Sequence, residues 1–185
     1  MNDQTAIHQS GCQEDAGSAA HLDTLVDLVV QRLTLAVDVA AAKYGSGDPI
    51  DDPIREQQVL RSAGCALNVT PLSHRIGMQF FRDQIEASKV IQRGLHHRWQ
   101  RHPEEIPAAD PDLAAEVRPR LERVTAQIIQ QFKCMNEMPH CKPGDIIDLI
   151  DRRFSAALPE RQLPGLHRHA ALFAMRSLCA SGVTS

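Results

Sequence analysis

Apolar residues recur every three to four positions along most of this chain, which is the spacing of amphipathic helices. The first regular stretch runs from Leu22 to Lys43. Its apolar positions are Leu22, Leu25, Val26, Val29, Val30, Leu33, Val37 and Ala40. Two cations, Arg32 and Lys43, interrupt this pattern. Eleven residues make about three turns, so both cations lie on nearly one face, about 16 Å apart along the axis, where their long side chains can hold a small dianion.

Turn and cap residues divide the next part of the chain into two further helices. Glycines and prolines between Tyr44 and Pro53 predict a loop, after which Asp52 is a candidate N-cap and Pro53 the first helical residue. Gly64 weakens the end of that helix. Thr70 and Pro71 then open a long helix that reaches about Trp99.

The second half of the chain follows the same pattern. Three prolines predict a loop over residues 102–112, and another helix starts near Leu113, where Pro119 either kinks it or marks its first turn. A loop over residues 134–144 precedes helices at Asp145–Leu158 and Gly165–Ala180. No useful length alternates with period two, so the sequence predicts an all-α, single-domain bundle of about five to six helices, with three long ones forming the site.

Residues 1–21 have no such periodicity and predict a mobile N-terminal tail. The helical domain then spans residues 22–185. We expect residues 22–130 to form the core with the site, and residues 131–185 to add C-terminal helices.

Composition supports a helical domain and limits the partners. The 185 residues are 43% hydrophobic and only 4% aromatic, which favours helices over strands. A net charge of -3 and a pI near 6.3 give no global attraction to nucleic acid or to an anionic membrane. Any anion must therefore be bound by locally placed cations, and the ligand is expected to be small.

The expected cellular compartment and the state of the cysteines both depend on whether the protein is exported. Residues 1–21 have no basic start or apolar core, so we expect a cytoplasmic protein if Met1 is the natural start, and a periplasmic or secreted one if a signal peptide was removed. None of the five cysteines forms a CxxC pair, and reduced thiols are the default. In an exported protein, a disulfide from Cys179 to Cys134 or Cys141 would pin the last helix.

Three motifs stand in a specific order along the first half of the chain. They are QRLTLAVDVAAAK (31–43), PIDDPIRE (49–56) and DQIEASKVIQ (83–92). Together they resemble the all-helical chorismate mutases, especially the larger, often exported subclass with extra C-terminal helices. The resemblance implies an enzyme that rearranges chorismate to prephenate by an intramolecular Claisen reaction. It further implies a site made within one chain, a homodimer, and no cofactor or metal.

The residue types of the motifs suit that chemistry. Chorismate carries two carboxylates, an ether oxygen and a hydroxyl, so its recognition needs cations, a hydrogen-bond donor and an acceptor. The reaction needs no general base. The enzyme must hold the chair-like conformer and stabilise the negative charge that builds on the ether oxygen.

The resemblance assigns the donors first. Arg32 would bind a substrate carboxylate, and Lys43 would donate to the ether oxygen and to a carboxylate. Gln92 would donate to the ether oxygen from the other side, with Ser88 one turn earlier joining the carboxylate contacts. Because a glutamine is a donor at every pH, we expect a flat pH profile near neutrality.

The resemblance also assigns the acceptors and two further arginines. Asp52 and Glu56 match positions that accept from the substrate hydroxyl. Arg55 matches one that steadies the loop and its carboxylates. Arg123 is the candidate for the last arginine, because its place on the later helix is similar to that of the family's arginine there.

Other interpretations remain open at the level of sequence. Arg32 and Lys43 alone could be solvated helix charges, and the histidines and arginines of residues 93–102 fit a solvated helix end better than nucleic-acid contact. Neither His140 with Cys141 nor His167 with His169 has a standard zinc interval. A same-fold enzyme could act on isochorismate or an aminated chorismate analogue, and a helical binding or regulatory protein could keep the fold without turnover.

Overall fold

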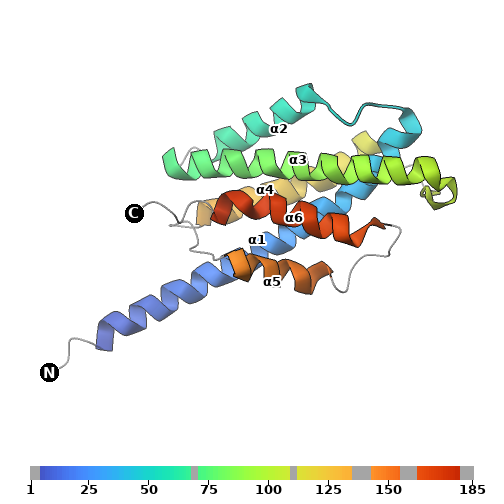
Figure 1. Cartoon of the computed structure of the whole chain (residues 1–185). Coiled ribbons are helices and arrows are strands. Elements are labelled where there is room, and N and C mark those ends of the chain that lie inside the picture. Colours follow the sequence, from blue (N-terminus) through green and yellow to red (C-terminus); the bar gives the residue numbers. More distant parts are fainter. Residues whose placement is uncertain (1–4, 68–70, 109–111, 135–142, 155–161, 180–185) are drawn as a thin grey trace.

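Helices make up the whole regular structure of the described chain (Figure 1). The computed structural model describes residues 5–67, 71–108, 112–134, 143–154 and 162–179. Within them lie α1 (Thr5–Ser46), α2 (Pro53–Ala66), α3 (Pro71–Arg101), α4 (Arg118–Cys134), α5 (Pro143–Phe154) and α6 (Pro164–Cys179), with a 3-10 turn η1 (Pro103–Glu105) and a π turn η2 (Leu113–Val117). The described residues contain no strand, so the all-α single-domain prediction is confirmed.

Helix α1 is the centre of the bundle and packs against α3, α4, α5 and α6. Its predicted start near Leu22 is wrong, because the helical backbone begins at Thr5. The first part of α1 projects beyond the other helices (Figure 1), so it needs no apolar face, and apolar periodicity could not reveal it. The boundary between a tail and a domain at residue 21 stays a prediction.

Helix α2 starts as its sequence predicts. Asp52 is the N-cap, and its Oδ1 accepts a hydrogen bond from the backbone N–H of Arg55 at 3.0 Å, with Pro53 in the first turn. This cap satisfies one of the free N–H groups at the helix end. The predicted cap at Thr70 lies outside the described residues.

The beginning of α4 settles the role of Pro119. Asp112 Oδ1 accepts hydrogen bonds at 2.8 Å from the N–H groups of Ala114 and Ala115 and starts η2, from which α4 continues at Arg118. Pro119 therefore stands in the first turn of α4, directly after the π turn.

The two C-terminal helices cover α1 and α3. Helix α6 packs along α3 more extensively than any other pair of elements. Gly94 permits this approach, since a Cβ there would lie 2.3 Å from Leu166 Cδ2. The side chains of Cys134 and Cys179 and all of Cys141 lie outside the described part, so the conditional disulfide is untested.

An aromatic cluster fixes the C-terminal end of α1 against α3. The ring of Tyr44 meets Trp99 edge-on at 5.4 Å and His96 at 5.0 Å. His96 Nε2 donates to the Ala40 carbonyl at 2.8 Å, and Trp99 is buried. This end of α1 is where Lys43 leaves the helix. In the part of the chain that is described, no helix is both long and apolar enough to cross a bilayer.

Candidate active site

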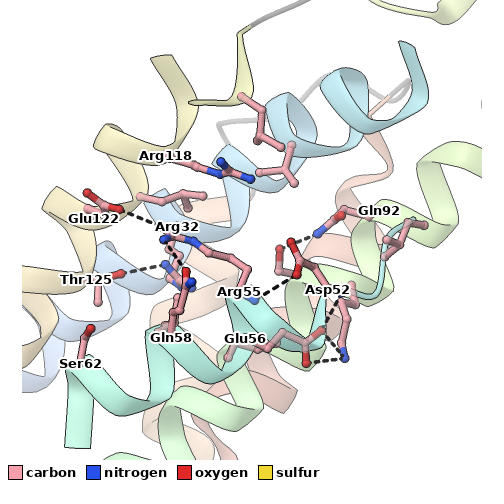
Figure 2. Close-up of a pocket in the computed structure, with 18 of the residues that line it drawn as sticks. Arg32, Asp52, Arg55, Glu56, Gln58, Ser62, Gln92, Arg118, Glu122 and Thr125 are labelled. Atoms are coloured by element: carbon pink, nitrogen blue, oxygen red, sulfur yellow. Dashed lines mark hydrogen bonds and ion pairs between the residues drawn. The ribbon is translucent and has the colours of Figure 1, made fainter. Parts of the chain in front are cut away.

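One pocket of about 380 Å³ lies between α1, α2, α3 and the start of α4 (Figure 2). Its volume is within the range of small-molecule sites. Apolar side chains from all four helices form part of its wall. Among its lining residues are all seven candidates from the first three motifs: Arg32, Lys43, Asp52, Arg55, Glu56, Ser88 and Gln92.

Arg32 is a buried cation with an incomplete set of partners. Its side chain comes from the core face of α1, and Nη1 donates to Thr125 Oγ1 on α4 at 2.9 Å. Among the described residues Arg32 has no ion pair, and its Nε has no hydrogen-bond partner. Burial and the nearby Arg55 guanidinium lower the pKa of Arg32 to about 10. A guanidinium held this way favours an anion beside it.

Lys43 is the second buried cation of α1. Its Nζ donates to the backbone carbonyls of Pro49 and Ile50, each at 2.8 Å, so the loop after α1 fixes its direction. Burial lowers the pKa of Lys43, and the carboxylates of Asp52 and Asp48 partly offset this. An ammonium has three N–H donors, so one stays available for a ligand in the pocket.

Asp52, Arg55 and Glu56 form the α2 wall of the pocket (Figure 2). Besides capping the helix through Oδ1, Asp52 donates its own backbone N–H to Glu56 Oε1 at 3.3 Å, which gives a reciprocal cap. Arg55 crosses towards α4, where Nη2 pairs with Glu122 Oε1 at 2.7 Å. The short α2 thereby places one cation and two carboxylates along one side of the pocket.

Ser88 and Gln92 meet one turn apart on α3, as their spacing predicts. Gln92 Nε2 donates to Ser88 Oγ at 3.0 Å, while the buried Oε1 has no partner in the described part of the chain. The oxygen and the nitrogen of a carboxamide have nearly the same shape, so either of them can face Ser88. After a half-turn of the amide, Ser88 donates to Oε1 and Nε2 becomes a free donor for a ligand.

The structure places Arg118 in the lining of the pocket and leaves Arg123 outside it. The pocket face of α4 follows helical spacing, and Arg123 is exposed and outside it. Five residues separate the two arginines, which turns Arg123 about 140° away from the face that Arg118 occupies. The residues of α4 on the pocket face are Arg118, Leu121, Glu122, Thr125, Ala126 and Ile129.

Lys89 is a pocket residue that the sequence did not single out. Its Nζ lies 2.6 Å from Glu86 Oε1, 3.2 Å from Glu56 Oε1 and 3.3 Å from Asp51 Oδ1. A lone lysine on a long helix is typical of solvated surface, and no spacing signal marks it as buried.

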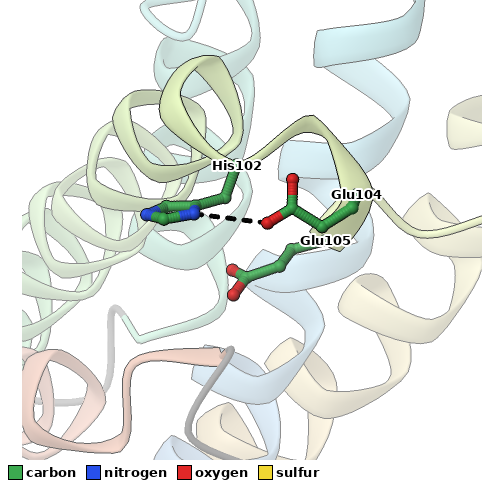
Figure 3. Close-up of side chains that lie close together, drawn as sticks. All are labelled: His102, Glu104 and Glu105. Carbon is green, nitrogen blue, oxygen red and sulfur yellow. Dashed lines mark hydrogen bonds and ion pairs between the residues drawn. The ribbon is translucent and has the colours of Figure 1, made fainter.

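A group of one histidine and two glutamates lies away from the pocket, at the end of α3. His102, Glu104 and Glu105 have ligand atoms within 4.8 Å of one another (Figure 3). His102 Nδ1 contacts Glu104 Oε1 at 3.3 Å, and Glu105 is bound by Arg98. These contacts are therefore typical of ion pairs at a solvated helix end. His140 and Cys141 lie outside the described residues.

Comparison with known proteins agrees with this geometry. The family model described as chorismate mutase type II matches residues 20–93. A secreted chorismate mutase of Mycolicibacterium smegmatis is 33% identical over 172 residues, covering 89% of each chain. Crystal structures of chorismate mutases from Burkholderia phymatum and Burkholderia thailandensis both superpose with a TM-score of 0.71. They have 27% and 31% identity and cover 88% and 86% of this chain and 98% and 99% of their own. The chain therefore belongs to the chorismate mutase family.

Proposed function

We propose that the pocket binds chorismate and catalyses its intramolecular Claisen rearrangement to prephenate. The observation that carries this proposal is the pair of buried cations on α1. In the described part of the chain neither Arg32 nor Lys43 forms an ion pair, yet both line one pocket with the Gln92 carboxamide. Buried charges without counter-ions are costly, so a dianionic substrate supplies what the free site lacks.

The arginines account for the two carboxylates. Arg32, Arg55 and Arg118 reach the pocket from α1, α2 and α4 (Figure 2). Arg118 has no ion pair among the described residues. Guanidinium groups bind carboxylates with paired N–H bonds, so three of them can fix both carboxylates of a folded conformer. Holding that conformer removes much of the entropic cost of bringing the reacting carbons together.

Lys43 and Gln92 account for the ether oxygen. As the C–O bond of chorismate breaks, negative charge builds on that oxygen. The free N–H of Lys43 and the Nε2 of Gln92 in its rotated state can both donate to it. Donors that are already in place stabilise the transition state more than the substrate, because no reorganisation is needed during the reaction.

The substrate hydroxyl is assigned to Asp52 rather than Glu56. Asp52 Oδ1 is used in the helix cap, which leaves Oδ2 of this pocket-lining residue as an acceptor. Both oxygens of Glu56 lie 3.2 Å from Lys89 Nζ. All atoms of the product come from the substrate, so this mechanism uses no general base. The homodimer implied by the resemblance stays a prediction.

The deciding experiment follows the loss of chorismate absorbance with purified protein and identifies the product. We expect prephenate to form in proportion to enzyme concentration. Release of pyruvate, or no reaction, would overturn the proposal. Isochorismate and 4-amino-4-deoxychorismate, tested in parallel, separate it from the second enzymatic interpretation, which would require faster turnover of one of these. Tight chorismate binding without turnover would instead point to a binding protein.

A further inference from the structure

Lys89 is a charged side chain of the pocket to which the proposed mechanism gives no role. It stands on α3 one residue after Ser88 and is only 8% exposed. Burying an ammonium costs several kcal/mol unless it is well paired. Burial lowers the pKa of Lys89, but hydrogen bonds from the ammonium to Glu86 and Glu56 outweigh it and raise the pKa above its ordinary value. Lys89 is therefore a permanent cation at the pocket wall.

The partners of Lys89 connect α3 to the start of α2. Glu86 is on the same helix, one turn earlier, but Asp51 and Glu56 flank the first residues of α2. Both oxygens of Glu56 accept from Lys89, and one of them, Oε1, also accepts the backbone N–H of Asp52. Asp52 in turn caps the N–H of Arg55. A continuous set of contacts thus runs from the Lys89 ammonium to the backbone of Arg55.

Few other contacts fix the first turn of α2. Among its described residues only Ala63, in its last turn, is fully buried, and Ile54 next to the cap is 73% exposed. Its main neighbour is α3. The apolar contacts lie at the far end, where Gly77 packs against Leu67. Polar contacts must therefore locate the first turn, from which Arg55 extends.

We propose that Lys89 is a positioning residue that holds Glu56 and the first turn of α2, and so places Arg55 opposite Arg32 in the pocket. Lys89 then acts through Glu56 and not on the substrate. Its kinetic consequence rests on the proposed function, but its effect on the first turn of α2 does not.

The test compares wild-type protein with K89M, K89R, E56Q and the double variant K89M/E56Q. K89M removes the charge and keeps the length of the side chain. We expect the KM for chorismate to rise about tenfold while kcat falls less than about threefold, because a loosened Arg55 weakens carboxylate binding in substrate and transition state alike. K89R restores KM to within about threefold of wild type. In the E56Q background, K89M adds less than about twofold, since contacts in one network are not additive.

Hydrogen exchange gives a readout that needs no activity. In K89M we expect the three hydrogen-bonded amides of this turn, those of Asp52, Arg55 and Glu56, to exchange about tenfold faster, with those of α3 unchanged. The matched control is R93Q. Arg93 binds the same Asp51 at 2.8 Å one turn later, but it is exposed and outside the pocket, so KM and exchange stay within about twofold.

Two results would overturn the inference. The first is unchanged amide exchange at Asp52, Arg55 and Glu56 in K89M, and the second is a K89M effect on KM that persists in full in the E56Q background. Circular dichroism shows whether K89M folds, and K89Q replaces it if it does not. An inactive wild type would instead refute the proposed function, while the exchange data would still decide the role of Lys89.

Discussion

The α1 and α2 walls of the pocket both carry cations but hold them in different ways. On α1, Arg32 and Lys43 leave a helix whose surroundings are packed, and they are 7% and 8% exposed. On α2, Arg55 is held by Glu122, whose side chain is 65% exposed. One wall fixes its charges by burial and by hydrogen bonds to neutral groups, and the other by an ion pair.

The cations of the α1 wall are therefore preorganised, whereas the position of the α2 cation can adjust. A cation fixed by packing cannot turn away from the reacting oxygen, but its burial costs free energy in the absence of a ligand. A cation fixed by exposed ion pairs costs little to place, and salt weakens those ion pairs. We therefore expect the α1 wall to determine the rate and the α2 wall to tune binding.

The largest effect should come from Lys43→Ala. Removal of one preorganised donor to a developing oxyanion typically costs about 3 to 4 kcal/mol of barrier, so kcat should fall about 100- to 1000-fold. The thermal unfolding midpoint should stay close to that of wild type, because the surrounding apolar face is retained. A loss of activity confined to KM would mean that Lys43 binds substrate without stabilising the transition state.

Arg32→Met should show how much free energy the burial of an unpaired charge costs in the ligand-free protein. We expect kcat/KM to fall about 100-fold, since a buried carboxylate contact is lost, and the free protein to gain about 1 to 3 kcal/mol of stability. Burial lowers the pKa of Arg32 in the folded state to about 10, below its ordinary value in the unfolded chain. The folded state therefore binds fewer protons than the unfolded chain only between those two pH values. Stability rises with pH there, and below about 10 the penalty is constant.

The gain from Arg32→Met should accordingly be the same at pH 6 and pH 8, as measured by urea unfolding. Arg120→Met is the control, because Arg120 is exposed and pairs with Asp38 at 2.7 Å. It should change neither stability nor turnover appreciably. A less stable Arg32→Met protein would show that the α1 cation contributes to the fold.

The pH profile tests the donors directly. With Gln92 neutral, kcat should be flat from pH 6 to 8. On the alkaline side it should fall as Lys43 loses its proton, at a pH below the ordinary lysine value because burial lowers the pKa of Lys43. Gln92→Glu must be protonated to donate, so its rate should fall up to about tenfold per pH unit above its pKa. A steep loss of wild-type turnover between pH 6 and 8 would exclude Gln92 as the ether donor.

The smallest effects should come from the α2 wall. Glu122→Gln removes the exposed partner of Arg55 and should change KM by about twofold, because such pairs contribute about 0 to 1 kcal/mol. The salt dependence of KM should also become weaker. If Glu122→Gln instead lowers kcat strongly, the α2 wall is as rigidly coupled to the reaction as α1, and the contrast between them fails.

Much of the fold and part of the pocket lining could be predicted from local patterns. The cap at Asp52 and the helix start at Pro53 depend on the chain nearby, and the interval from Arg32 to Lys43 fixes their common face. These features need no knowledge of distant residues.

What could not be predicted depends on tertiary structure. Whether Arg118 or Arg123 faces the pocket depends on how α4 packs against α1, which the spacing of the two arginines does not determine. From the sequence alone Lys89 is typical of a surface lysine, because its pairing with Asp51 and Glu56 depends on how α2 packs against α3. The first part of α1 projects beyond the other helices, and apolar periodicity could not reveal it.

The aromatic cluster at the end of α1 gives the protein a built-in spectroscopic probe. Trp99 is the one tryptophan of the chain, and it contacts Tyr44, the residue after Lys43. Its emission therefore reports on a single place, close to the wall that we expect to determine the rate. Ligand titrations and stopped-flow mixing can follow this end of α1 without any label.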